Sequence, residues 1–560
     1  MTKSTKSPWQ LVRNGFGPRR GPLVVVVMDG VGVGRGDEGD AVARARKPVL
    51  ERLWREHPTT RLRAHGVAVG LPSDDDMGNS EVGHNALGAG RVFDQGAKRV
   101  GQALRDGSLF AGEVWRALTA QCRGHATPLH FIGLLSDGNV HSHVDQLYAL
   151  IRRAHEEGVA QLRVHPLLDG RDVGGQTALV YVDALERLLS EINATPGRDY
   201  CIASGGGRMV VTMDRYEANW PVVERGWKAH VLGQGRRFAS ARQAIETFRA
   251  EDPTVGDQFL GEFVVERDGQ PVGTIEDDHA VVLFNFRGDR AIQITRAFEE
   301  TAFAPFDRVR TPRVLFAGMM QYDGDLGLPK HYLVTPPTID RTLGECLARN
   351  GIRQFACSET QKYGHVTYFW NGNRSGKFDE ALETYLEVPS DRVPFEQRPW
   401  MRAAEITDAT IAALQGGATG LLRINYANGD MVGHTGSLSS TLLAVEAVDL
   451  CLGRLLAVVE QVGGIALVTA DHGNADQMFE LKKNGEIERD EAQQPRIRTA
   501  HSLNAVPFTI FDPAFAGEYE LAPDVAPGGL SNVAATALWL MGYQPLSDYD
   551  AALVRPRGGG

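Results

Sequence analysis

A serine lies within a glycine-rich, acidic stretch, "DDDMGNSEVGHNALGAG" (residues 74–90), whose composition raises a question about its chemistry. Asn79 precedes Ser80, and the stretch contains no Lys or Arg to attract a phosphate group. The spacing Gly78-x-Ser80-x-x-Gly83 also differs by one residue from the G-x-S-x-G elbow of serine hydrolases. If Ser80 is a nucleophile, groups from elsewhere in the chain must activate it.

Acid and imidazole groups follow short apolar runs in several distant parts of the sequence. These groups are Asp29, Asp430, His434, Asp471, His472 and His501. Carboxylate oxygen and imidazole nitrogen without thiolate form the ligand set of Mn²⁺, Zn²⁺ or Fe²⁺, and two such clusters can hold a pair of ions. A serine oxygen bound to a divalent cation has a lowered pKa and can attack phosphorus without a neighbouring base. A single Asp after a strand is more often a turn former or a helix cap, so this hypothesis depends on the whole set.

The central part of the sequence contributes cations beside loops. The motifs "LLDGRDVGG", "SGGGRMVVTMDRY" and "FNFRGDRA" supply Arg171, Arg208, Arg215, Arg287 and Arg290, with Asp172 beside the first of them. Arginine forks bind phosphate and carboxylate groups in a bidentate manner, which indicates a small substrate with two or three negative charges. The alternative for any one of these arginines is a surface salt bridge.

Two further motifs offer groups for phosphate binding or proton transfer. "SDGNVHSH" contains His141 and His143, which can bind phosphate or relay protons, or can simply form hydrogen bonds within a loop. "ETQKYGHV" contains Lys362, which taken alone would be interpreted as solvent-exposed.

A dinucleotide-binding fingerprint is also present, but its surroundings argue against that function. Gly34-x-Gly36-x-x-Gly39 follows an apolar run, as the fingerprint requires. The acidic side chains of Asp37, Glu38 and Asp40 would repel a pyrophosphate group. The sequence therefore does not favour a Rossmann site.

The elements that must position these groups are predicted to be buried parallel strands. Apolar, β-branched runs begin at Leu23, His130, Arg163, Ala280, Leu421 and Ile465, and each ends in an Asp-rich or Gly-rich loop. Continuous apolar runs suit strands covered on both faces, and stretches such as 441–463 show helical periodicity. Ligands of such α/β sheets collect beyond the carboxyl ends of the strands, where this sequence has its Asp, His and Arg residues.

The length of the chain predicts more than one domain. A chain of 560 residues exceeds the size of a single core, and similar strand–Asp junctions near residues 29, 430 and 471 suggest one domain built from both ends of the chain. We expect a flexible leader over 1–20, a discontinuous domain over 21–94 and 336–560, and an inserted domain over 95–335.

Composition excludes several classes of protein. The formal net charge of −11 argues against nucleic-acid and membrane-surface partners, because both need basic faces. The apolar run 23–28 is too short for a membrane span or a signal-peptide core, so a cytoplasmic protein is predicted. The five cysteines form no C-x-x-C pair and are interpreted as small buried hydrophobic residues.

The motifs together resemble a known family. "MDGVG", "MGNSEVGHNALGAGRV", "LLSDGNVHSHVDQL", "DGRDV", "GGGRMVVTMDRY", "NFRGDRA", "KYGHVT", "NGDMVGHTG", "TADHGNAD" and "HSLNAVP" occur in the order typical of cofactor-independent phosphoglycerate mutases of the alkaline phosphatase superfamily. The resemblance extends from about residue 20 to 550. Arg208 and Arg215 stand seven apart and the segment 371–380 is additional, as in the longer branch of plants and trypanosomatids.

The resemblance implies a fold and a set of site residues. The discontinuous α/β domain is expected to be alkaline-phosphatase-like, and the inserted α/β domain phosphotransferase-like. One divalent metal ion is expected on Asp29, Ser80, Asp471 and His472, and a second on Asp430, His434 and His501. The substrate set implied by the resemblance is His141, Arg171, Asp172, Arg208, Arg215, Arg287, Arg290 and Lys362. Mn²⁺ is the expected metal, with Mg²⁺ or Co²⁺ as alternatives.

The implied activity is the interconversion of 3-phosphoglycerate and 2-phosphoglycerate in glycolysis and gluconeogenesis, by a monomer that needs no 2,3-bisphosphoglycerate. Ser80 would take the phosphoryl group, glycerate would be retained, and Asp172 would exchange the proton between its hydroxyls. A metal-dependent phosphatase of the same superfamily is the main alternative, but a hydrolase has no need to retain its leaving group. A threonine nucleophile would be expected in a phosphopentomutase. A metal-binding protein without activity would be expected to lack Ser80, Asp172 or Lys362.

Overall fold

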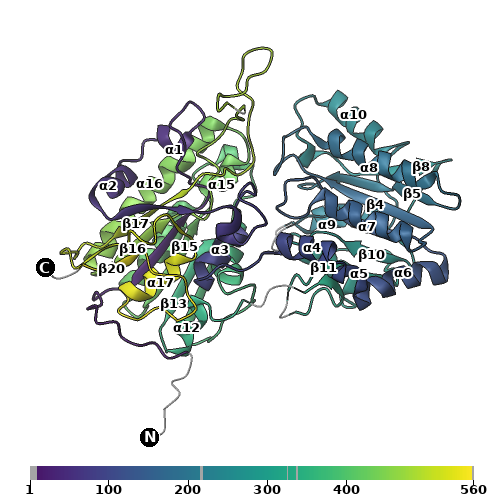
Figure 1. The fold of residues 1–560 in the computed structure, drawn as a ribbon. Helices are drawn as coiled ribbons and strands as arrows, with labels where there is room; N and C mark the ends of the chain where they lie inside the picture. The colour runs from purple at the N-terminus through teal and green to yellow at the C-terminus, as the bar shows by residue number, and fades with distance from the viewer. Residues whose placement is uncertain (1–8, 215–218, 324–325, 336–338, 483, 558–560) are drawn as a thin grey trace, which may run out of the picture. The chain divides into compact units, whose positions relative to one another are not determined.

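A computed structural model describes residues 9–214, 219–323, 326–335, 339–482 and 484–557. The chain divides into two compact units (Figure 1). The discontinuous unit comprises the described residues of Met1–Gln95 and Thr338–Gly560, and the inserted unit those of Gly96–Pro337. Each unit contains its own sheet with helices packed on it, so the predicted fold class of two α/β units is confirmed.

The discontinuous unit contains an eight-stranded sheet. In spatial order its strands are β14 (Glu383–Val388), β13 (Gln354–Glu359), β15 (Leu421–Tyr426), β1 (Leu23–Met28), β16 (Ile465–Thr469), β17 (Val506–Phe511), β2 (Thr59–Arg63) and β19 (Gly528–Gly529). The first five strands are parallel, and β17 is antiparallel to both of its neighbours. Every residue of β1, β15 and β16 is buried, as expected for parallel strands covered on both faces.

Helices pack on this sheet and share its hydrophobic core. They are α1 (Ala41–Arg44), α2 (Pro48–Glu56), α3 (Ser80–Ala89), α12 (Leu343–Arg349), α13 (Thr360–Gly364), α14 (Ala403–Gln415), α15 (Asn428–Gly433), α16 (Leu438–Gln461) and α17 (Asn532–Leu540). The helix predicted over 441–463 corresponds to α16, whose buried residues recur at three- and four-residue intervals, among them Val445, Val448 and Leu452. A two-stranded sheet of β18 (Tyr519–Leu521) and β20 (Val554–Pro556) lies apart from the main sheet.

Residues 9–20 pack against the discontinuous unit. The Arg19 guanidinium donates to Asp512 from Nε at 2.9 Å, and the Asn14 amide donates to the Trp539 carbonyl oxygen at 2.9 Å. The ring of Phe16 contacts that of Trp539, with centroids 4.7 Å apart. A leader ending at residue 20 was predicted because the stretch is polar, but this part of it is held by side-chain contacts that only the tertiary structure provides.

The inserted unit contains a second, mostly parallel sheet. The spatial order of its main path is β12 (Tyr332–Val334), β11 (Leu315–Met320), β10 (Ala280–Leu283), β3 (Leu129–Leu135), β4 (Gln161–Leu168), β6 (Ser204–Gly207), β8 (Phe263–Arg267) and β7 (Arg236–Phe238). Two short strands, β5 (Asp199–Ile202) and β9 (Gln270–Pro271), pair with β4 and β8. The runs predicted as strands at His130, Arg163 and Ala280 correspond to β3, β4 and β10.

Helices cover the two faces of the inserted sheet. They are α4 (Gly96–Arg105), α5 (Ser108–Ala111), α6 (Glu113–His125), α7 (Val144–Glu156), α8 (Ala178–Asn193), α9 (Trp220–His230), α10 (Ala241–Glu251) and α11 (Ile292–Glu299). One core lies between the sheet and helices that include α6, α7 and α8, and the other between the sheet and α9 and α11. None of the helices in the described residues combines the length and apolar character needed to cross a lipid bilayer.

Candidate active site

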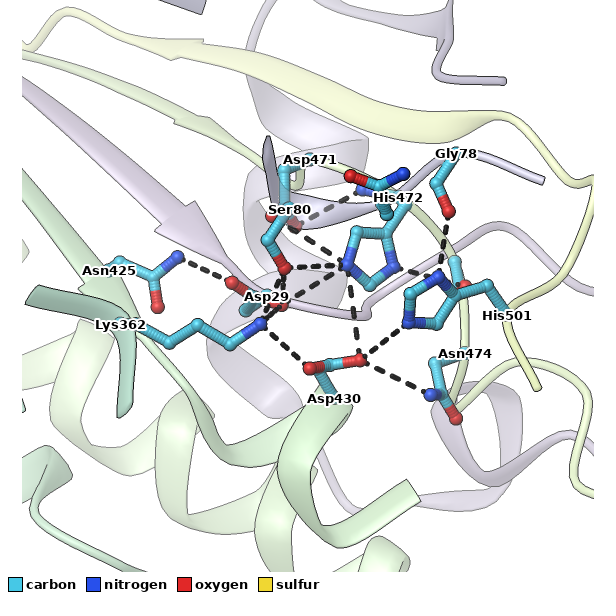
Figure 2. Close-up of polar contacts among 12 residues, drawn as sticks. Asp29, Gly78, Ser80, Lys362, Asn425, Asp430, Asp471, His472, Asn474 and His501 are labelled. Atoms are coloured by element: carbon cyan, nitrogen blue, oxygen red, sulfur yellow. Dashed lines mark hydrogen bonds and ion pairs between the residues drawn. The ribbon is translucent and has the colours of Figure 1, made fainter. Parts of the chain in front are cut away.

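Three neighbouring strands bring the predicted acids of the discontinuous unit together. Asp29 follows β1 directly, Asp471 lies two residues beyond β16, and Asp430 lies in α15, which follows β15. Because β15, β1 and β16 are adjacent and parallel, their carboxyl ends meet at one edge of the sheet. All three carboxylates are buried, and Figure 2 shows them pointing toward a common centre. The strand order explains why acids so far apart in sequence form one cluster.

Ser80 occupies the first position of α3 and faces this cluster. The Asn79 side chain caps the helix by accepting from the backbone N–H groups of Glu81 and Val82. The Ser80 hydroxyl oxygen lies 3.3 Å from Asp29 Oδ1 and 3.0 Å from His472 Nε2. The asparagine that precedes the serine therefore fixes the start of the helix that presents the serine.

The glycines around Ser80 permit close approach of other backbone segments. A Cβ atom on Gly78 would lie 1.9 Å from the Ala64 carbonyl oxygen, and one on Gly83 would lie 2.7 Å from that of Asp471. Any side chain at these positions would push α3 away from the acids. The spacing that did not match a hydrolase elbow is thus a packing requirement of this helix.

His434 and His501 direct lone pairs toward Asp430. His434 Nδ1 lies 2.6 Å from the Thr499 carbonyl oxygen and His501 Nδ1 lies 2.7 Å from that of Gly78, so both Nδ1 atoms must donate. In their neutral forms both imidazoles therefore carry a lone pair on Nε2, and these Nε2 atoms lie 2.9 Å from each other and 3.0 and 3.1 Å from Asp430 Oδ1. Three converging acceptors of this kind fit a bound cation, with the carbonyls fixing the imidazole tautomers.

A second group of ligand atoms surrounds Ser80. Asp29, Asp430 and His472 form one set of neighbouring ligand atoms, and Asp29, Asp471 and His84 form another. Burial lowers the pKa of His472, but the carboxylates of Asp471, Asp29 and Asp430 outweigh it and raise that pKa to about 9. The negative potential of this cluster therefore favours a cation at its centre.

Lys362 lies inside the same cluster, not at the surface. Its ammonium group donates to Asp29 Oδ1 and Asp430 Oδ2, both at 2.7 Å, and lies 2.5 Å from the Ser80 hydroxyl oxygen (Figure 2). The side chain is 1% exposed. It extends from α13, which continues into a π-helical turn at His365–Phe369, a feature often found at functional sites. Lys362 is therefore positioned to neutralise charge on the serine oxygen.

A buried glutamate just before this helix gives a test of the local packing. Glu359, at the end of β13, accepts from the Arg402 backbone N–H at 3.0 Å, and burial raises its pKa to about 7. A carboxyl group whose pKa is higher in the folded than in the unfolded state stabilises the fold at pH values below the unfolded-state pKa. This stability is lost as the pH rises through the folded-state pKa of about 7. Glu359→Gln should remove that loss, so the variant should gain about 3 kcal/mol relative to the wild type between pH 4.5 and pH 8.

Thermal unfolding of both proteins at the two pH values measures this gain. The matched control Glu387→Gln makes the same exchange of carboxylate for amide at an exposed position of the neighbouring strand β14. An offset for Glu359→Gln that does not depend on pH would contradict the assignment.

The inserted unit contains a second buried cluster, centred on Arg208. Its guanidinium donates to Asp169 Oδ1 at 2.8 Å and also to Asp172 Oδ2. Asp169 accepts in addition from the Ser136 hydroxyl at 2.6 Å. Burial, and then the negative charge of Asp172, raise the pKa of Asp169. Two buried carboxylates thus hold one guanidinium in a fixed position beyond the ends of β4 and β6.

Three more of the predicted side chains of this unit, Arg287, Arg290 and His141, are also buried. Arg287 Nε lies 3.0 Å from Asp289 Oδ1, and Arg290 donates to the Met213 carbonyl oxygen at 2.8 Å. His141 Nδ1 lies 3.6 Å from Asp289 Oδ1, and burial followed by the charge of Arg208 lowers the pKa of His141 well below its usual value. Buried arginines held by backbone and carboxylate groups suit anion binding, not surface salt bridges.

The other predicted cations of this unit differ in their placement. Arg171 is 7% exposed, whereas His143 caps α7 by accepting from the backbone N–H of Asp145. Arg215 lies outside the described residues. His143 therefore has the loop role that was the simpler of its two interpretations.

Several side chains of these clusters escaped the sequence analysis. His84, one helical turn after Ser80, donates from Nδ1 to the Ser80 carbonyl oxygen at 2.8 Å, and its Nε2 accepts from Asn425 at 3.2 Å. Asn425 in turn donates to Asp29 Oδ2 at 2.7 Å. Asp169 and Asp289 could have been identified from the sequence, because each lies within one of the arginine-containing motifs. For His84 the only indication in the sequence was its spacing of four residues from Ser80.

The dinucleotide-like glycines have a structural explanation. A Cβ atom on Gly34, the first glycine of the fingerprint, would lie 2.3 Å from Asp40 Oδ2. One on Gly32, which precedes the fingerprint in the same loop, would lie 2.4 Å from Asp476 Oδ1. Asp40 caps α1 by accepting from the backbone N–H of Ala43. The glycines accommodate acidic side chains, as expected of a loop that does not bind pyrophosphate.

A buried serine among carboxylate and imidazole ligands, on an α/β sheet, defines a metalloenzyme, and residues 21–545 match the metalloenzyme superfamily. The chain is 52% identical over 535 residues to a probable 2,3-bisphosphoglycerate-independent phosphoglycerate mutase of Leptospira interrogans (serogroup Icterohaemorrhagiae, serovar copenhageni), covering 95% of this chain and 97% of that one. Against the 2,3-bisphosphoglycerate-independent phosphoglycerate mutase of Trypanosoma brucei brucei, identity is 52% over 539 residues, covering 96% and 98%.

A solved structure agrees with these sequence relatives. Leishmania mexicana phosphoglycerate mutase, determined at low cobalt concentration, matches with a TM-score of 0.96 and 50% identity, covering 98% of this chain and 100% of that one. This chain therefore belongs to the 2,3-bisphosphoglycerate-independent phosphoglycerate mutases. The resemblance inferred from the motifs is confirmed, and divalent metal ions are the cofactors that the metalloenzyme match and the ligand clusters indicate.

Proposed function

We propose that this chain interconverts 3-phosphoglycerate and 2-phosphoglycerate through a phosphoserine at Ser80, retaining glycerate between the two half-reactions. The observation that carries the proposal is the placement of the Ser80 hydroxyl oxygen 2.5 Å from the Lys362 ammonium and 3.0 Å from His472 Nε2, among buried carboxylates. A serine in this setting is held ready for nucleophilic attack on a phosphoryl group.

Two divalent ions, Mn²⁺ in our proposal with Mg²⁺ or Co²⁺ as alternatives, fit the two ligand groups. Asp29, Ser80, Asp471 and His472, whose side chains adjoin one another, would hold one ion. Asp430, His434 and His501, which form one group of neighbouring ligand atoms, would hold the other. When bound, such ions lower the pKa of a serine hydroxyl and neutralise charge on phosphoryl oxygens. The convergence of the His434 and His501 lone pairs on Asp430 supports this assignment.

Each of the remaining side chains has a definite task in this proposal. Lys362 donates to the Ser80 oxygen and offsets charge that develops on the transferred group. Asn425 keeps Asp29 oriented by donating to its second oxygen. In the inserted unit the arginines hold the carboxylate and phosphate of the substrate. The proposed substrate set is His141, Arg171, Asp172, Arg208, Arg215, Arg287 and Arg290.

Asp172 is proposed to move the proton between the glycerate hydroxyls. It gives a proton to the 3-oxygen as the phosphoryl group leaves that oxygen for Ser80. It takes a proton from the 2-hydroxyl when that oxygen in turn accepts the phosphoryl group from Ser80. The bond from Arg208 keeps the Asp172 carboxylate in one orientation for this exchange. A monomer is the proposed working unit.

A metal-dependent phosphatase is the second candidate, and the inserted unit argues against it. Six predicted substrate side chains of that unit, His141, Arg171, Asp172, Arg208, Arg287 and Arg290, are all at most 7% exposed. Building so many charged groups into the interior is costly, and a hydrolase that releases its alcohol product gains nothing from them.

A coupled assay for 2-phosphoglycerate distinguishes the two candidates. The enzyme is given 3-phosphoglycerate and Mn²⁺ without 2,3-bisphosphoglycerate, while free phosphate is measured in parallel. We expect isomerisation with little phosphate release. Phosphate release without isomerisation would assign the chain to the hydrolases and would make the proposed role of the arginines wrong.

A further inference from the structure

A line of buried hydrogen-bonded side chains crosses the sheet of the inserted unit. We call the set His279, His130, His165, Ser204, His230 and Thr212 the histidine network. His279 directly precedes β10, while His130, His165 and Ser204 lie on the adjacent strands β3, β4 and β6. His230 ends α9, and Thr212 lies in the loop between Arg208 and Asp214. None of these side chains belongs to the proposed substrate set.

The network lies beneath helices, away from solvent over most of its length. His130 and Ile132 share one face of β3, as do His165 and Leu167 on β4, because side chains two apart in a strand point the same way. That face packs against α9 and α11. His130, His165 and His230 are fully buried, and burial lowers their pKa values, so all three are neutral.

The backbone at one end fixes the direction of the first hydrogen bonds. The Glu276 N–H donates to His279 Nδ1 at 3.2 Å, so that nitrogen is an acceptor. His130 Nε2 lies 2.9 Å from the same atom and must therefore donate to it. A neutral imidazole has one N–H and one lone pair, so His130 Nδ1 accepts from His165 Nε2, 2.9 Å away.

The same reasoning continues to the other end. His165 Nδ1 accepts from the Ser204 hydroxyl at 2.7 Å, and the Ser204 oxygen accepts from His230 Nδ1 at 2.8 Å. His230 Nε2 is left with its lone pair and accepts from the Thr212 hydroxyl at 2.9 Å. Both ring nitrogens of His130, His165 and His230 have a partner of the right kind, and the line ends on Thr212.

Thr212 needs such an anchor because its backbone is strained. Its φ is 69°, in the left-handed region that β-branched residues avoid. Its side chain lies against Gly226 of α9, where a Cβ atom would be 2.0 Å from the Thr212 hydroxyl oxygen. Its backbone N–H donates to the Val222 carbonyl oxygen at 2.9 Å. Contacts with α9 therefore hold this residue in a conformation that the free chain would leave.

Thr212 is adjacent in sequence to a residue that contacts the proposed anion site. The next residue, Met213, offers the carbonyl oxygen that accepts from Arg290 at 2.8 Å. Arg208, four residues before Thr212, donates to Asp169 and Asp172. A relaxed Thr212 would turn the Met213 carbonyl and release Arg290 from its present position.

We propose that the histidine network is a positioning device, which holds Thr212 in its strained conformation and so fixes Arg290 for binding the negatively charged substrate. The proposal rests on the proposed function for the identity of that substrate. His230, His165, His130 and Ser204 act through Thr212, and they are positioning residues that do not touch the substrate.

Thr212→Val removes the last donor of the network and preserves the shape of the side chain. Because Arg290 binds substrate in our proposal, the KM for 3-phosphoglycerate should rise about tenfold, whereas kcat should change less than about threefold. Thr212→Ser keeps the hydroxyl and should return KM to within about twofold of the wild type. Steady-state assays with full-length, metal-loaded enzyme measure these values.

A matched control separates positioning from general loss of stability. Thr119 of α6 is as fully buried as Thr212 and lies in the same unit, within the other core layer. Thr119→Val should lower the melting temperature without changing KM. Equal KM changes in Thr119→Val and Thr212→Val, or a wild-type KM in Thr212→Val, would overturn the proposal.

The tautomers give a second measurement that does not depend on activity. In full-length enzyme labelled with ¹⁵N-histidine, His130 and His165 should carry their proton on Nε2, and His230 on Nδ1. The opposite assignment at any of the three would overturn the network. If the wild type does not isomerise phosphoglycerate, the proposed function is wrong. The positioning role is then decided by the tautomers and by comparing the thermal shift that 3-phosphoglycerate causes in the wild type with the shift it causes in Thr212→Val.

Discussion

Ser80→Ala is expected to lower kcat for isomerisation by about 10⁴-fold or more, because it removes the atom proposed to carry the phosphoryl group. The change deletes one oxygen from a side chain that is 3% exposed, and it leaves the asparagine cap and the helix intact. Incubation with 3-phosphoglycerate labelled with ³²P, followed by acid quenching, measures the phosphoenzyme. We expect none in the variant.

The control for this variant is Ser531→Ala. Ser531 is 2% exposed in the same unit, and its hydroxyl donates to Asp550, which belongs to neither candidate cluster. Its replacement should reduce stability and leave turnover unchanged. Elemental analysis should find the same metal content in both variants. Appreciable turnover by Ser80→Ala would disprove the role of Ser80 and would leave the metal assignment standing.

Removal of bound divalent metal is expected to abolish isomerisation and to lower the melting temperature together. Asp29, Asp430 and Asp471 are each at most 2% exposed and lie close to one another, so a cation that binds them opposes their repulsion. A ligand present at about 1,000 times its Kd stabilises the folded state by about 4 kcal/mol. Dialysis against chelator, followed by stepwise return of Mn²⁺, should therefore restore melting temperature and turnover in parallel.

Asp430→Asn tests the same point without chelator. Asp430 belongs to two of the ligand groups and accepts a hydrogen bond from Lys362. Its replacement by an uncharged side chain should reduce the amount of bound metal and should lower turnover at least about 10³-fold. Asp408→Asn is the matched control, since Asp408 is 63% exposed and pairs with Arg454 at the surface. Full activity after exhaustive chelation would make the metal interpretation wrong.

The sequence was most informative where one local pattern determines one structure. The apolar runs at Leu23, Leu421 and Ile465 form buried parallel strands, and the acids that follow them lie at one edge of the sheet. A six-residue β-branched run can hardly form anything else, and the edge at which its following residue lies is set by strand direction. The placement of Asp29, Asp430 and Asp471 was therefore predictable.

What the sequence could not provide were contacts that depend on the order of strands and on packing between helices. Lys362 alone would be interpreted as an exposed lysine, and only the tertiary structure places its ammonium between Asp29 and Asp430. His230 lies in no quoted motif, and nothing within "SGGGRMVVTMDRY" marks Thr212 as its partner, because their hydrogen bond joins the end of a helix to a separate loop. Residues 9–20 looked unstructured for the same reason, since Asp512 holds Arg19 from the far end of the sequence.

The position of β1 in the sheet has a consequence for synthesis of the chain. Both neighbours of β1 in the sheet, which begin at Leu421 and Ile465, lie far after it in the sequence and leave the ribosome long after β1. At a translation rate of about 5–20 residues per second, the segment "LVVVVM" stays without its neighbouring strands for tens of seconds. The inserted unit is continuous in sequence and can fold during this time. A short, uncharged β-branched segment left unpaired for so long invites aggregation. We therefore expect nascent chains stalled before residue 421 to depend on chaperones, and those stalled after the last strand has emerged to be resistant to protease.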